Sequence, residues 1–136
     1  MKLSILVTTL FLFGLSTHCS SADYYIDSVG GSDSYDGLSL RTPWKSHTKV
    51  ESASLVAGDI VHFKRGSAFS GNLRISASGT AALPIRLTSY GKGDLPKFTN
   101  PHTDDADGNA IILGGDYIIV ENLHFHDTPG EYVSAR

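Results

Sequence analysis

The sequence predicts an all-β fold in which short strands follow one another and are separated by tight turns. Between Gly58 and Gly93, three short runs of β-branched and aromatic residues alternate with clusters of Gly, Ser and Pro. That spacing is typical of stacked short strands and not of helices. A second regular stretch, residues 111–126, repeats the pattern, and residues that favour helices are scarce.

The predicted strands alternate apolar and polar residues, which gives each strand an inner and an outer face. Residues 23–27 form the first strand, and in residues 59–64 Val61 and Phe63 alternate with Ile60, His62 and Lys64. The runs 73–75 and 85–87 repeat the alternation, with Arg74 and Arg86 facing outward. The corners are marked by glycines at positions 58, 66, 71, 79, 91 and 93.

The stretch 111–126 predicts one complete turn of such a stack. Its inward residues are Ile118, Val120, Leu123 and Phe125, with a corner at Glu121 and Asn122. We expect about 20–25 residues per turn, which is within the usual span of a solenoid repeat.

A single helix is expected near residues 43–53. Thr42 is suited to cap its N-terminus, and Pro43 has the backbone angle of a first helical position. Its apolar face would carry Trp44, His47, Val50 and Ala53. We interpret Trp44 as a buried plug for the end of the stack; an exposed platform for stacking a sugar is the alternative.

Five motifs together resemble the N-terminal part of secreted right-handed parallel β-helix proteins, the pectate lyase-like superfamily of polysaccharide lyases and related glycoside hydrolases. These motifs are YYIDSVGGSDSYDG, RTPWKSHTKV, GDIVHFKRG, SGTAALPI and YGKG. The resemblance covers residues 23 to about 127 and implies the first coils of a solenoid, with a short α-helix that covers its open N-terminal end. It identifies the fold better than the reaction.

The first 22 residues are predicted to be a secretory signal peptide. Lys2 precedes an apolar run, and Ser20 and Ala22 are the small residues of a cleavage site. The run is shorter than the roughly 20 residues of a membrane anchor, and Thr17 and His18 disfavour lipoprotein processing at Cys19. We therefore expect an exported protein, extracellular or periplasmic, with residues 23–136 as its domain.

Composition limits the possible partners. The only cysteine, Cys19, lies in the leader, so no disulfide is expected in the mature chain, and the formal net charge of the whole chain is −3. Because no run of basic residues is present, nucleic acid and membrane surfaces are not expected as partners. A polysaccharide substrate or ligand is expected, with the protein as a monomer.

The end of the sequence, residues 131–136, is typical of a strand that begins another turn. No capping segment follows it in the sequence, although a solenoid needs a cap at each end. We therefore expect this domain to be incomplete at its C-terminus.

Several polar residues are candidates for a substrate site. His124 and His126 alternate on one predicted strand, so their rings leave from the same face, and Asp127 and His102 are possible neighbours. The alternative is that these histidines are ordinary solvated positions. The resemblance to lyases adds candidate bases, all of which also fit structural or surface roles: Lys64, Arg65, Arg74 and Arg86.

Two acidic clusters are candidates for calcium. The first contains Asp33 and Asp36, and the second contains Asp104, Asp105 and Asp107. Carboxylates beside glycine suit a hard cation, but Asp and Gly are also ordinary residues of tight turns. Calcium is therefore a possible cofactor, and no other cofactor is indicated.

The main functional expectation is a carbohydrate-active protein, a polysaccharide lyase that acts on acidic polysaccharide. A glycoside hydrolase of the same fold, a non-catalytic glycan-binding or adhesin module, and an inert fragment are the alternatives. Catalytic groups in such folds come from several adjacent coils, so this segment alone is expected to be inactive, and its catalytic residues are not assigned.

Overall fold

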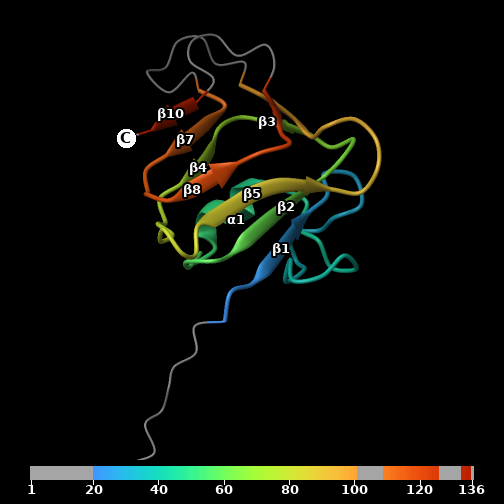
Figure 1. Cartoon of the computed structure of the whole chain (residues 1–136). Helices are drawn as coiled ribbons and strands as arrows, with labels where there is room; N and C mark the ends of the chain where they lie inside the picture. Colours follow the sequence, from blue (N-terminus) through green and yellow to red (C-terminus); the bar gives the residue numbers. More distant parts are fainter. Residues whose placement is uncertain (1–19, 101–108, 126–132, 136) are drawn as a thin grey trace, which may run out of the picture.

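The computed structural model describes residues 20–100, 109–125 and 133–135. These residues form three parallel sheets and very little helix, which confirms the all-β prediction (Figure 1). The first sheet contains β1 (Asp23–Ile26), β2 (Ile60–Lys64), β5 (Ile85–Tyr90) and β8 (Ile118–Val120). The second contains β3 (Ala68–Ser70), β6 (Lys97–Thr99) and β9 (His124–Phe125). The third contains β4 (Leu73–Ile75), β7 (Ile111–Leu113) and β10 (Val133–Ala135).

The chain visits the three sheets in a fixed order. After β2 it passes through β3 and β4 and returns to the first sheet as β5, which pairs with β2. The same cycle then runs through β6 and β7 to β8, and on through β9 to β10. All the pairings between these strands are parallel, as expected for residues 59–126.

The parallel register places apolar side chains above one another inside the stack. In the second sheet, Phe69 lies opposite Phe98, and Phe98 opposite Phe125. The ring centroids of the first pair are 5.0 Å apart and those of the second pair are 5.6 Å apart. Phe63 of the first sheet meets Phe98 edge-on at 5.1 Å. These aromatic contacts join the sheets through one buried core.

The predicted in–out alternation is confirmed in these strands. Val61, Leu87 and Ile75 are buried, while Arg74 is exposed and Arg86 is half-buried. Four other residues that were expected to face inward pack against the core: Ile118, Val120, Leu123 and Phe125. The predicted corner is present at Asn122, whose φ is 56°.

The predicted length of a turn was too short. Ile60 pairs with Arg86, and Arg86 pairs with Ile119, so successive turns of the first sheet exceed 25 residues. The loops between the strands account for the difference, because residues 91–96 separate β5 from β6 without forming a strand.

The predicted helix began too early. Helix α1 spans only Thr48–Ser52, and Trp44 instead forms a parallel bridge with Ile26. The Trp44 N–H donates to the Tyr25 carbonyl (2.9 Å), and the Asp27 N–H donates to the Trp44 carbonyl (2.8 Å). Trp44 cannot start a helix, because its backbone groups are already hydrogen-bonded to Tyr25 of β1 and to Asp27, which follows β1. The expected cap residue, Thr42, donates its hydroxyl to Asp36 instead.

Trp44 is buried, as the plug interpretation requires. Its side chain is in the core at 7% exposure and stacks on Tyr24 with centroids 5.2 Å apart. The indole N–H donates to the Tyr35 carbonyl (2.9 Å). Gly37 (φ 73°) makes room for the ring, since a Cβ there would lie 2.5 Å from it. This burial excludes the exposed sugar-stacking platform.

The segment from Trp44 to α1 covers the core beside the first strands. His47 is buried and meets Phe69 edge-on at 5.6 Å, and α1 packs against β4 with Val50 buried. In Figure 1, α1 lies behind the first sheet. No helix among the described residues has the length and apolar character needed to cross a membrane.

We predict that Trp44→Ala lowers the free energy of unfolding by about 3–5 kcal/mol, because it removes a buried aromatic ring. Denaturant unfolding of the mature chain measures this. Leu40→Ala is the control, because Leu40 is 63% exposed and its loss should change stability by less than about 0.5 kcal/mol. Equal effects of the two substitutions would contradict the core position of Trp44.

Candidate functional site

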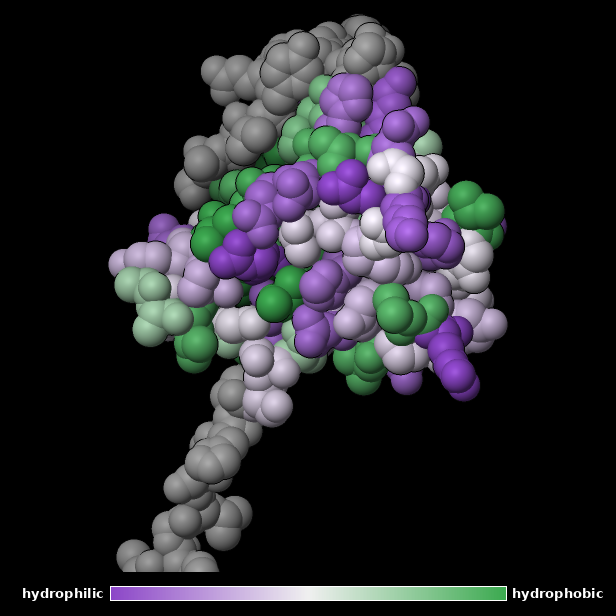
Figure 2. Space-filling model, turned by 45° about the vertical axis from the view of Figure 1, so that its right-hand side comes forward, coloured by the Kyte–Doolittle hydropathy of each residue, from purple (hydrophilic) through white to green (hydrophobic). Residues whose placement is uncertain are grey.

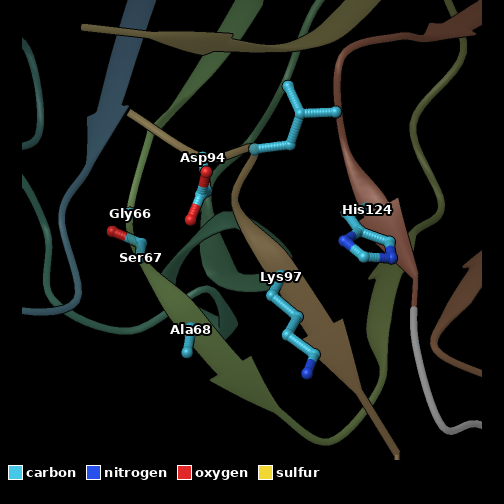
Figure 3. A pocket seen from close by; sticks show the side chains of 7 residues that line it. Gly66, Ser67, Ala68, Asp94, Lys97 and His124 are labelled. Atoms are coloured by element: carbon cyan, nitrogen blue, oxygen red, sulfur yellow. The ribbon is translucent and has the colours of Figure 1, made fainter. Parts of the chain in front are cut away.

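An open groove of about 550 Å³ lies on the outer side of the second sheet (Figure 3). Residues of β3, β6 and β9 form it together with the loops that precede β3 and β6. Its described lining consists of Gly66, Ser67, Ala68, Asp94, Leu95, Lys97 and His124.

The parallel register brings the groove side chains together. Ala68 lies opposite Lys97, and Lys97 opposite His124. Each of these residues directly precedes a phenylalanine of the core, and successive side chains of a strand point to opposite faces. The stacked phenylalanines therefore direct positions 68, 97 and 124 outward, along one line across neighbouring strands.

Backbone hydrogen bonds fix the walls of the groove. The Gly66 N–H donates to the Asp94 carbonyl (2.8 Å), and the Lys97 N–H donates to the Ser67 carbonyl (2.9 Å). The His124 N–H donates to the Pro96 carbonyl (2.9 Å). The loop that carries Asp94 is thus hydrogen-bonded to Gly66 before β3 and to His124 of β9. Backbone hydrogen bonds between neighbouring strands and loops therefore fix the shape of the groove.

The groove combines an ammonium, an imidazole and a carboxylate around a floor of small residues. Figure 3 shows Lys97 and His124 on neighbouring strands, with Asp94 set apart from them. These groups can donate to and accept from the hydroxyl groups of a sugar. The described lining contains one carboxylate, Asp94, whereas glycoside hydrolysis generally uses two.

The structure separates the predicted site residues. His124 lies in the groove, whereas Arg86 lies on β5 of the first sheet, where its guanidinium binds Glu121 at 2.7 Å. His126, His102 and Asp127 lie outside the described residues.

The other candidate bases have structural positions. Lys64 binds the carboxylate of Asp27 at 2.6 Å, and Arg65 donates to the Gly93 carbonyl at 3.3 Å. Arg74 is exposed on β4 of the third sheet, where its backbone N–H donates to the Glu51 carboxylate. None of these three cations is among the described residues that line the groove with His124.

Asp33 and Asp36, the first calcium candidates, accept hydrogen bonds from other residues of the same N-terminal loop. Asp33 accepts hydrogen bonds from the Lys45 N–H (3.0 Å), the Ser46 N–H (2.8 Å) and the Ser46 hydroxyl (2.6 Å). Burial acts to raise the pKa of Asp33, but these hydrogen bonds outweigh it and hold the pKa below its usual value. Asp36 accepts from the Thr42 hydroxyl and the Leu38 N–H, which likewise lower its pKa.

These are contacts of the kind that turn-forming residues make, which was the alternative to calcium, and calcium at Asp33 and Asp36 stays a prediction. Within the described part of the chain, no three His, Cys, Asp or Glu side chains are grouped so as to hold a metal ion. The second cluster, Asp104, Asp105 and Asp107, lies outside the described residues.

Sequence reasoning did not single out Lys97 or Asp94. A signal for Lys97 was present, because the dipeptides Ala68-Phe69, Lys97-Phe98 and His124-Phe125 repeat one outward residue before one inward phenylalanine. No local signal marked Asp94, whose position depends on the loop before β6.

A second polar surface lies on the outer face of the first sheet. Tyr25 stacks on His62 with centroids 4.9 Å apart, and Tyr90 meets Tyr25 edge-on at 5.5 Å. His62 also binds the carboxylate of Asp23 at 2.8 Å. Burial raises the pKa of Tyr90 to about 12, with further contributions from the Asp27 carboxylate and from Tyr25.

Comparison with known proteins connects this chain with carbohydrate-active enzymes. No protein-family model matches it. A lacto-N-biosidase from Bifidobacterium longum subsp. longum is 39% identical over 86 residues, which cover 60% of this chain and 5% of that protein. Crystal structures of a GH136 lacto-N-biosidase from Eubacterium ramulus, native and selenomethionine-substituted, match with a TM-score of 0.68 and 29% identity.

This chain is similar to one part of these lacto-N-biosidases. The structural match covers 82% of this chain and 21% of the Eubacterium chain. The relatives are glycoside hydrolases, so the comparison supports the hydrolase alternative and not the lyase that was the main expectation. Membership of the pectate lyase-like superfamily is not shown.

We predict that Tyr90 ionises near pH 12, later than the usual value of 10.0. Because its pKa is raised on folding, the neutral phenol stabilises the fold below pH 10, and this contribution is lost as the pH rises through about 12. Phenolate absorbance measured against pH tests this, with Tyr90→Phe to assign the step. A Tyr90 step at pH 10 in the folded chain would contradict the burial of its hydroxyl.

Proposed function

We propose that this chain forms the first coils of a secreted glycoside hydrolase with a right-handed parallel β-helix, related in activity to the lacto-N-biosidases. The observation that carries the proposal is the structural match over 82% of the chain at 29% identity and a TM-score of 0.68. The segment builds and caps one end of the enzyme, and other parts of the whole protein supply the catalytic groups.

The path of the chain supports the β-helix. The strands visit three parallel sheets in the same order on each cycle, as the winding of a solenoid requires. Parallel connections of this kind are right-handed in nearly all known cases.

The two ends of the stack differ, which supports the addition of further coils. The segment from Trp44 to α1 covers the core beside the first strands, while Ile118, Val120 and Phe125 of the later strands are only partly buried. In Figure 2, the largest hydrophobic area of the view lies in its upper half, and the hydrophobic patches below are separate. A further coil stacked on β8 and β9 would bury the partly exposed apolar side chains of these two strands.

The proposed reaction is hydrolysis, and the groove of Lys97 and His124 is proposed as a contact for the glycan. The described groove has one carboxylate, Asp94, so the acid and the nucleophile or base of a glycosidase are proposed to lie on other coils. The leader sequence supports secretion, which would place the enzyme outside the cell or in the periplasm.

We predict that the isolated mature chain cleaves neither a chromogenic lacto-N-bioside nor, with calcium present, pectate, alginate or glycosaminoglycans. A full-length lacto-N-biosidase serves as the positive control, and boiled protein as the blank. Release of the chromophore would contradict the proposal by showing that the catalytic carboxylates lie within this chain. Release of unsaturated sugars would restore the lyase interpretation.

We also predict that lacto-N-biose binds in the groove of the mature chain, weakly but measurably by NMR titration. Lys97→Ala should weaken binding about ten-fold, because a hydrogen bond to its charged ammonium contributes about 1.5–3 kcal/mol. His124→Ala should weaken binding several-fold, because a typical hydrogen bond contributes about 0.5–1.5 kcal/mol. Arg41→Ala removes an exposed cation from the N-terminal loop and should leave binding unchanged. Equal binding by all three variants would contradict a glycan contact in this groove.

A further inference from the structure

A buried carboxylate lies directly against the start of the folded chain. Asp59 is 1% exposed. Its Oδ1 accepts a hydrogen bond from the Ala22 N–H (2.7 Å), and its Oδ2 accepts one from the Val56 N–H (2.9 Å). Ala22 immediately precedes β1, at the position where the predicted leader ends.

No cation among the described side chains compensates the charge of Asp59. The ion pairs between described residues join His62 to Asp23, Lys64 to Asp27 and Arg86 to Glu121. A buried carboxylate is costly unless it is paired or well hydrogen-bonded. Of its two backbone donors, Ala22 is the one that proteolysis of the leader can convert into an ammonium group.

The fold uses both backbone groups of Ala22. Besides the bond to Asp59, the Ala22 carbonyl accepts the Ile60 N–H at 3.0 Å. Cleavage after Ala22 would delete both contacts and leave buried Asp59 with the Val56 donor alone. Cleavage one bond earlier keeps both contacts, and it places the small residues Ser21 and Cys19 at the −1 and −3 positions.

We propose that the leader is removed between Ser21 and Ala22, one residue before the boundary that the sequence pattern predicts, and that the new Ala22 ammonium pairs with Asp59. Hydrolysis of this peptide bond consumes one water: Ser21 leaves with a carboxylate, and the Ala22 nitrogen takes up the protons of an ammonium group. The inference rests on the proposed secretion and is independent of the glycosidase reaction.

The first test expresses the complete chain with its leader in a secreting host. N-terminal sequencing and intact mass of the processed protein should identify Ala22 as the first residue. A first residue of Asp23, or any other, would overturn the inference while leaving secretion intact. Retention of the leader would contradict secretion as well.

The second test does not depend on the peptidase of the host. It compares the denaturant unfolding of mature chains that begin with free Ala22, with N-acetylated Ala22, and with Asp23. The free ammonium should increase the folding equilibrium constant about ten-fold over the acetylated form, since hydrogen bonds between charged groups are the stronger ones. Equal stability of the free and acetylated forms would overturn the pairing.

A matched pair of variants assigns the effect to Asp59. In Asp59→Asn the free and acetylated forms should be equally stable, whereas in Asp23→Asn, which changes a 55% exposed carboxylate, the ten-fold difference should persist. Loss of the difference in Asp23→Asn alone would overturn the assignment. If Asp59→Asn does not fold, the comparison in the unsubstituted chain still decides the proposal.

Discussion

The parallel register of the strands is the constraint on which the rest of this structure depends. A slip of one residue would exchange the inner and outer faces of a strand. In the second sheet the register is stabilised by the stack of Phe69, Phe98 and Phe125, whose neighbouring rings are 5.0 and 5.6 Å apart. The same register that buries these rings aligns Ala68, Lys97 and His124 outside. The core and the groove are therefore two consequences of one alignment.

The core is covered differently near the first strands and near the later strands. Near the first strands, Trp44, His47 and α1 cover the core, and the bridge between Trp44 and Ile26 fixes their position. Near the later strands, the apolar side chains of β8 and β9 are only partly buried. The lacto-N-biosidases to which the chain is similar are several times longer than the matched part. The groove presents Lys97, His124 and Asp94 on the outer side of the second sheet.

Much of the fold was predictable from the sequence because it follows from local alternation. Val61 and Phe63, and likewise Leu73 and Ile75, face inward as their spacing of two requires. The start of the helix was not predictable, because the local capping pattern of Thr42 and Pro43 is overruled by backbone bonds from Trp44 to Tyr25 and Asp27.

The candidate site was predictable only in part. The outward position of His124 follows from its own strand, but its neighbour Lys97 belongs to the preceding turn of the chain. The loop lengths set which residues of successive turns lie side by side, and no local pattern predicts those lengths. For the same reason, the hydrogen bond from the Ala22 N–H to the Asp59 carboxylate was not predictable from the sequence.

The most direct test of this account is the disulfide cross-linking of register neighbours in residues 22–136, which contain no cysteine because the single cysteine of the sequence is Cys19. Ala68→Cys combined with Lys97→Cys places two thiols on directly opposed residues of parallel strands, within the Cα separation that a disulfide allows. The account predicts rapid, near-complete oxidation of this pair, and little oxidation when Ala68→Cys is combined with Arg86→Cys on the first sheet. Efficient cross-linking of the second pair and not of the first would contradict the register and, with it, the groove and the stacked core.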